Sequence, residues 1–120
     1  MRKPTALSAS ATVALSRLRA VVAALEGASE TTSFGHPTFK VNGTSFAVLD
    51  RYAGEDCLWL RVAPPDRAAL LASEGWSESP YDPRRTAMIC RLASIDWRRI
   101  RTSIRESYRL AALAPPTRRR

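Results

Sequence analysis

Four arginines in the C-terminal third of the chain recur at a spacing that suits a row of phosphate groups. Arg98, Arg101, Arg105 and Arg109 follow the spacing i, i+3, i+7 and i+11, so on an α-helix they form one stripe. A guanidinium group binds a phosphate through two parallel hydrogen bonds, and such a row therefore matches a nucleic-acid backbone. The alternative is a solvated helix face whose arginines interact with the helix dipole.

A second set of cations comes from the predicted strands. Lys40, Arg61 and Arg91 fall on strand positions that point away from the side of the sheet expected to carry the core. Trp59 falls among them, and an aromatic ring between cations can stack on a base. The alternative is that a loop or a dimer partner covers Trp59. Both basic surfaces would contact backbone phosphates, which predicts weak sequence preference and strong salt dependence.

Three further side chains could line a cleft for a small molecule, namely His36, Tyr81 and Tyr108. A catalytic His36 would need a nucleophile or carboxylate beside it, and the sequence names none. Ser107 lacks the Gly-x-Ser-x-Gly context of a nucleophile, and no Gly-rich phosphate loop is present. We therefore expect a protein that is not an enzyme and needs no cofactor.

The cysteines indicate neither a disulfide nor a metal site. Cys57 and Cys90 lie in apolar, strand-like runs without a Cys-x-x-Cys spacing. This pattern favours two buried free thiols in a reducing compartment. Because the chain has one histidine, we expect no metal site.

The charge of the chain limits its partners. Nineteen Lys and Arg residues against eleven Asp and Glu give a formal net charge of +8. Such a chain is attracted to polyanions such as nucleic acid or acidic membrane surfaces, although an arginine-rich composition alone also produces this charge. No apolar run approaches the roughly 20 residues needed to cross a bilayer. We expect a cytoplasmic protein without a membrane partner.

The elements that must position these residues fit one domain. Helical spacing of apolar residues predicts a helix over residues 10–25 and a long helix from the N-cap candidate Asp96 to Pro115. Between them we expect a hairpin, a strand over 57–62, a short helix after Pro64-Pro65 and a strand at about 86–92. This order predicts an α+β fold, an antiparallel sheet with both terminal helices on one face. Residues 1–9 are expected to be a flexible N-terminus, 10–114 the domain and 115–120 a basic tail.

Asn42-Gly43 is the strongest hairpin signal, because a type I′ turn needs positive φ at both central residues. A two-residue turn predicts that Val41 pairs with Thr44, Lys40 with Ser45 and Phe39 with Phe46. The predicted apolar face then consists of Phe39, Val41, Phe46 and Val48, and the polar face of Thr38, Lys40, Ser45 and Ala47.

Three blocks of the sequence together resemble a known family. They are residues 33–49, with a Phe-Gly-x-Pro-x-Phe … Gly-x-x-Phe-Ala-x-Leu pattern, residues 60–71, and residues 96–110 with the run Glu106-Ser107-Tyr108-Arg109. Over about residues 15–113 the chain resembles the MmcQ/YjbR family of small bacterial proteins. This resemblance implies an α+β fold similar to CyaY and to type III secretion chaperones. It also implies DNA binding with a "double-wing" arrangement.

We therefore expect a non-enzymatic protein that binds nucleic acid, in particular double-stranded DNA, through phosphate contacts. The residues expected to bind are Lys40, Arg61, Arg91, Arg98, Arg101, Arg105 and Arg109. A chaperone-like protein-interaction module, with an apolar patch around Trp59 or Trp76, and a small-molecule-binding domain are the alternatives. The expected oligomeric state is a monomer or a weak homodimer.

Overall fold

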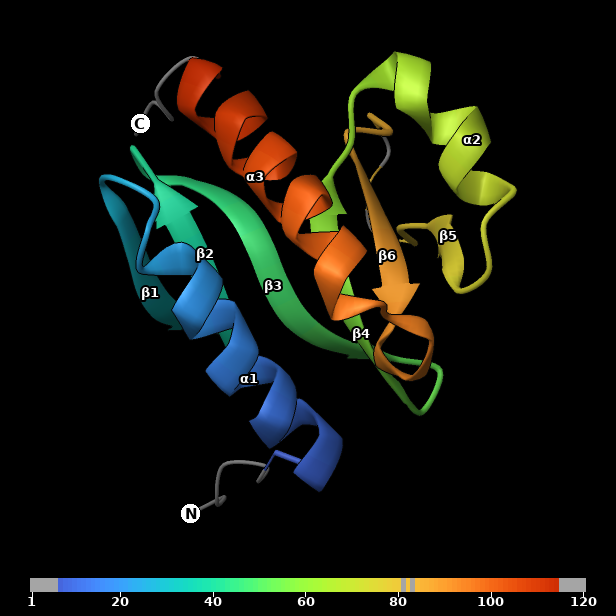
Figure 1. The fold of residues 1–120 in the computed structure, drawn as a ribbon, viewed down its shortest axis with the longest axis horizontal. Coiled ribbons are helices and arrows are strands. Elements are labelled where there is room, and N and C mark those ends of the chain that lie inside the picture. The colour runs from blue at the N-terminus through green and yellow to red at the C-terminus, as the bar shows by residue number, and fades with distance from the viewer. Residues whose placement is uncertain (1–6, 81, 83, 115–120) are drawn as a thin grey trace.

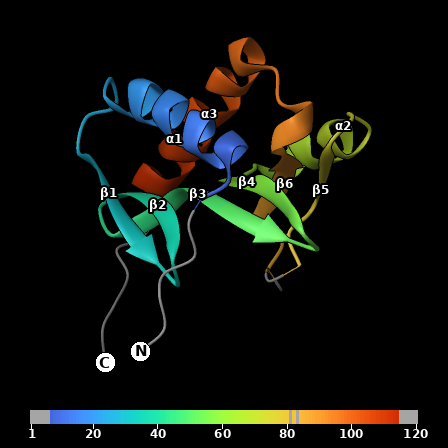
Figure 2. The same ribbon diagram turned by 90° about the horizontal axis from the view of Figure 1, so that it is seen from below.

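The computed structural model describes residues 7–80, 82 and 84–114. Its six strands form one antiparallel sheet in the order β1-β2-β3-β4-β6-β5 (Figure 1). The elements are α1 (Ala9–Val22), β1 (Ala28–Ser33), β2 (His36–Val41), β3 (Thr44–Tyr52), β4 (Glu55–Arg61), the 3-10 turn η1 (Pro64–Asp66), α2 (Arg67–Leu71), β5 (Trp76–Glu78), β6 (Ala87–Arg91), the 3-10 turn η2 (Leu92–Ser94) and α3 (Trp97–Leu113). Helices α1 and α3 lie on the same side of the sheet (Figure 2). The predicted α+β class is confirmed.

Helix α1 begins at a side-chain cap and ends earlier than predicted. The Ser8 hydroxyl accepts a hydrogen bond from the backbone N–H of Ala11 at 3.0 Å, so the helix begins at Ala9, one residue earlier than predicted. The helix ends at Val22 instead of residue 25, because the N–H groups of Ala24 and Leu25 bond to carbonyls three residues back. Residues 1–6 and the basic tail 115–120 lie outside the described residues.

Three two-residue turns connect the first four strands. Phe34-Gly35, Asn42-Gly43 and Ala53-Gly54 all have positive φ at both residues, which is the requirement of a type I′ hairpin turn. The turn predicted at Asn42-Gly43 is confirmed, as are the pairs Val41–Thr44 and Lys40–Ser45.

The predicted register is wrong beyond Lys40, because a β-bulge intervenes. Phe39 pairs with Ala47, not Phe46, and the register shifts between Phe39 and Lys40. Phe46 is therefore the additional residue in β3. Ala47 consequently joins Phe39 in the core, whereas Val48 pairs with Thr38 on the opposite face.

Two edge strands were not predicted. Strand β1 has the sequence Ala-Ser-Glu-Thr-Thr-Ser, and its central four residues are exposed. Strand β5 is three residues long. Strand β5 is too short, and the central residues of β1 are too polar, to show the alternation that marks a strand in sequence.

Helix α3 follows the predicted pattern. The Asp96 carboxylate accepts hydrogen bonds from the N–H groups of Arg98 and Arg99, which confirms the predicted N-cap. Ile100, Ile104 and Ala111 are buried in the core between this helix and the sheet. The buried face of α3 therefore fixes the direction of the arginines beside it.

Candidate nucleic-acid interface

Helices α1 and α3 enclose an open groove rich in arginine. We define the α1–α3 groove by its lining residues, which enclose about 510 Å³ and comprise Arg17, Ala20, Val21, Ala24, Trp97, Arg98, Arg101 and Arg105. Burial of Ile100 and Ile104 against the sheet turns Arg101 and Arg105 aside toward α1. Three of the four predicted α3 arginines thus lie in one groove, together with Arg17 of α1.

The four groove arginines differ from other arginines in their partners. Arg19, Arg51, Arg67, Arg91, Arg99 and Arg109 each pair with a carboxylate. Among the residues that the structure describes, no carboxylate lies within ion-pair distance of Arg17, Arg98, Arg101 or Arg105. Arg17 lies over the Trp97 ring, 5.7 Å from its centroid. The groove therefore carries positive charge that these carboxylates do not neutralise.

Arg109 does not extend this charge. Its guanidinium contacts the Glu106 carboxylate at 2.5 Å, and this hydrogen bond raises the pKa of Arg109 and lowers that of Glu106. Of the predicted stripe, Arg98, Arg101 and Arg105 therefore lack a carboxylate partner among the described residues, whereas Arg109 has one.

The cations predicted on the sheet lie apart from the groove. The strand register places Trp59 and Arg61 on the face away from α1 and α3, and Lys40 lies on the same face through its pair with Ser45. Arg91, at the end of β6, instead lines a pocket with residues of α1 and with Trp97. The structure therefore does not bring the two predicted sets of cations onto one surface. Arg91 lies beside Cys57, at the opposite end of β4 from Arg61, and pairs with Glu55 at 3.9 Å.

Arg61 is held within the protein. Its Nε donates to the Ser45 carbonyl at 2.7 Å, and its guanidinium lies 5.6 Å from the Trp59 ring centroid. Burial lowers the pKa of Arg61, and Asp82 partly offsets this effect. The Trp59 patch expected for a protein-interaction module is thus partly covered by Arg61, and Trp76 packs against the core.

The predicted cleft of His36, Tyr81 and Tyr108 is not formed by its described members. His36 Nε2 lies 3.3 Å from Asp50 Oδ1 near the start of β2. Tyr108 packs on Phe46 at a centroid distance of 5.5 Å and donates from its hydroxyl to the Glu26 carbonyl. His36 lies beside Asp50 and Tyr108 beside Phe46, so the two side chains contact residues near opposite ends of β3. Tyr81 lies outside the described residues.

The two thiols are buried and free, as predicted. Burial raises the pKa of Cys57 to about 12 and that of Cys90 to about 11. A thiol with so high a pKa is protonated and a poor nucleophile or metal ligand at neutral pH. In the described part of the chain, no cluster of three His, Cys, Asp or Glu side chains could hold a metal ion.

Sequence reasoning missed two residues of the groove. They are Arg17 and Trp97, which lie on different helices. Their shared place depends on α1 lying beside α3, which no local pattern reveals. Only the packing of α1 beside α3 brings the unpaired arginines and the Trp97 ring into one groove.

Comparison with known proteins identifies the family. The YjbR family model matches residues 23–110. The chain belongs to the YjbR family. The match includes Arg98, Arg101 and Arg105 but not Arg17, because α1 ends at Val22, before the matched segment of this YjbR protein begins. Searches of curated proteins and of solved structures found no match. None of the helices within the described ranges is long and apolar enough to span a membrane.

Proposed function

We propose that this YjbR protein is a non-enzymatic nucleic-acid-binding protein whose α1–α3 groove contacts backbone phosphates. The observation that carries the proposal is the gathering of Arg17, Arg98, Arg101 and Arg105 without a described carboxylate in ion-pair distance. Guanidinium groups bind phosphate oxygens with charge-assisted, bidentate hydrogen bonds. Phosphate contacts of this kind carry little sequence information.

The net charge supports the same proposal at longer range. A chain of formal charge +8 attracts a polyanion before contact is made. The sheet cations have a smaller part in the proposal, because Arg61 is engaged with Ser45 and Trp59, and Arg91 is paired with Glu55. Phosphate binding is therefore assigned to the helix side of the molecule.

The proposal predicts a defined salt dependence. Duplex DNA, the partner expected from the sequence, is titrated with the protein by fluorescence anisotropy at several salt concentrations. Four phosphates held by the four groove arginines correspond to a slope of log affinity against log salt of about −3.6. Absence of binding at low salt, or an affinity that does not change with salt, would refute the proposal.

A further inference from the structure

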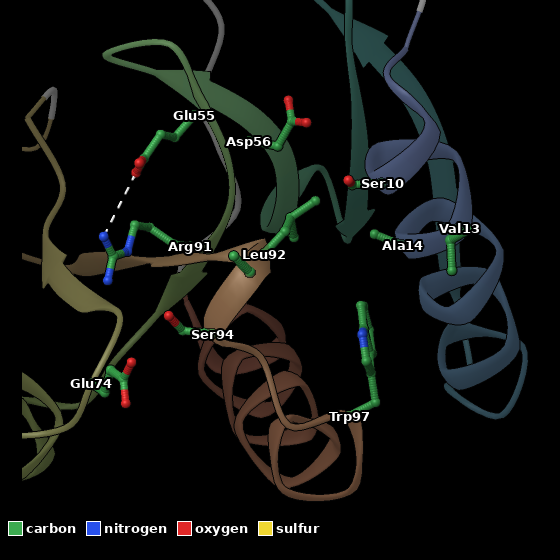
Figure 3. A pocket seen from close by; sticks show the side chains of 11 residues that line it. Ser10, Val13, Ala14, Glu55, Asp56, Glu74, Arg91, Leu92, Ser94 and Trp97 are labelled. Atoms are coloured by element: carbon green, nitrogen blue, oxygen red, sulfur yellow. Dashed lines mark ion pairs between the residues drawn. The ribbon is translucent and has the colours of Figure 1, made fainter.

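Trp97 belongs to two hollows at once. It lines the α1–α3 groove, and it also lines a pocket of about 710 Å³ on the other side of the start of α3. Figure 3 shows its ring rising into this pocket between Leu92 of η2 and the α1 side chains Val13 and Ala14. We call this hollow the Trp97 pocket. The Trp97 side chain therefore separates the α1–α3 groove from the Trp97 pocket, and a ligand in the groove can extend past it into the pocket.

The wall of the Trp97 pocket suits a flat apolar group. Val13, Ala14 and Leu92 line it beside the indole ring, and Val13 is 56 % exposed although it is aliphatic. An aromatic ring bordered by aliphatic side chains is the surface on which a nucleobase stacks, whichever base it is.

The rim of the pocket excludes phosphate. Glu55, Asp56 and Glu74 line it, against the single cation Arg91 within the same lining. Arg91 lies 3.9 Å from Glu55, and Asp56 is held by Ser8 and Arg51. Like charges repel, so a phosphate is favoured in the groove and disfavoured in the pocket.

We infer that the protein binds single-stranded nucleic acid, with phosphates in the α1–α3 groove and an unpaired base against Trp97 in the Trp97 pocket. The inference rests on the proposed function and names its substrate class. The groove accepts the charged part of the strand, and the pocket accepts the base.

A duplex satisfies only half of this arrangement. Its phosphates fit the groove, but a paired base reaches the pocket only after it is unpaired and unstacked, which costs free energy. A single strand presents its bases without that cost. The single strand therefore binds more tightly than the duplex of the same length.

The inference is tested by anisotropy with a labelled single strand and its duplex at one salt concentration. We expect the wild-type protein to bind the single strand about tenfold more tightly, the size of one stacking contact. In Trp97→Leu, which keeps an apolar side chain but removes the ring, we expect the ratio of single-strand to duplex affinity to fall to about one. Trp59→Phe, on the opposite face, retains the preference.

A second measurement uses the wild-type protein and so does not depend on the folding of a variant. A strand built from abasic residues carries the same phosphates without bases, and we expect it to lose the roughly tenfold advantage of the normal strand. Equal affinity for the single strand and the duplex would overturn the inference. So would a preference for the single strand that persists in Trp97→Leu or an abasic strand that binds as tightly as the normal one. In each case the proposed phosphate binding would still stand. Absence of binding to every probe refutes the proposed function itself.

Discussion

Ser107 connects the last helix to the one irregular point of the β2–β3 pair. Its buried hydroxyl donates to the Phe46 carbonyl and accepts from the N–H of Arg61 at 2.8 Å. Phe46 is the additional residue of the bulge, and Ser107 gives its carbonyl a hydrogen-bond partner from outside the ladder. One side chain thus joins α3 to two neighbouring strands.

Replacing this residue by Ser107→Ala is expected to destabilise the protein by about 1–3 kcal/mol, because two buried backbone groups lose their hydrogen-bond partner. Urea denaturation measures the change. Ser103→Ala, half-buried one turn earlier on the same helix, is the control and is expected to change stability by less than about 0.5 kcal/mol. Similar losses for the two variants would contradict the role given to Ser107.

Gly75 is required by close packing as well as by its backbone conformation. Its φ is +88°, and a Cβ atom at this position would lie 2.4 Å from Cβ of Ser94. Gly54 has a similar φ of +81° but no atom within 4 Å of such a Cβ. Gly54→Ala should therefore cost about 1–2 kcal/mol from backbone strain alone. Gly75→Ala should cost a further 1–3 kcal/mol or so from overpacking, as thermal or urea unfolding would show. An equal loss of stability in the two variants would mean that Ser94 moves away from the new Cβ atom without a measurable cost.

At the scale of elements, α1 supplies a part of the groove that the family match omits. Arg17 lies on α1 and before residue 23, where the match begins. If it holds one of four phosphates, Arg17→Ala should reduce the salt slope for duplex DNA by about 0.9. Anisotropy titrations provide the slope, with Arg19→Ala, whose guanidinium is paired with Glu30, as the matched control on the same helix. An unchanged slope in Arg17→Ala would restrict the interface to α3.

The sequence predicts those elements whose signals are local. Asn42-Gly43 fixes its turn through backbone conformation, and Asp96 fixes the start of α3 through a side-chain cap. The bulge at Phe46 could not be predicted, because its partner Ser107 lies 61 residues away in the chain. Strand β1 was missed because its polar, exposed residues carry no alternation.

The same distinction holds for the candidate site. The spacing of Arg98, Arg101 and Arg105 predicts a stripe, and these residues do lie together. Arg17 and Trp97 join them because α1 packs beside α3, which is a tertiary contact. Arg109 leaves the unpaired set because Glu106, three residues earlier, binds it. The sequence contains both partners of that pair, so the i,i+3 spacing could have indicated it.

At the scale of the whole molecule, net charge and local charge make different predictions. If the formal charge of +8 alone attracts nucleic acid, any two arginines are equivalent. If the α1–α3 groove binds it, the unpaired arginines matter more than the paired ones. Two double variants of α3 separate these cases, since each lowers the net charge by the same amount.

The decisive measurement compares the affinity of Arg101→Ala/Arg105→Ala with that of Arg99→Ala/Arg109→Ala for one duplex, across a range of salt concentrations. The first pair lies in the groove, whereas the second is bound to Asp96 and Glu106. We predict that the groove variant binds more weakly and loses about 1.8 from its salt slope, and that the slope of the control stays within about 0.5 of wild type. Equal loss of affinity and slope in the two variants would show that the charge acts as a whole, and would contradict an interface in the groove.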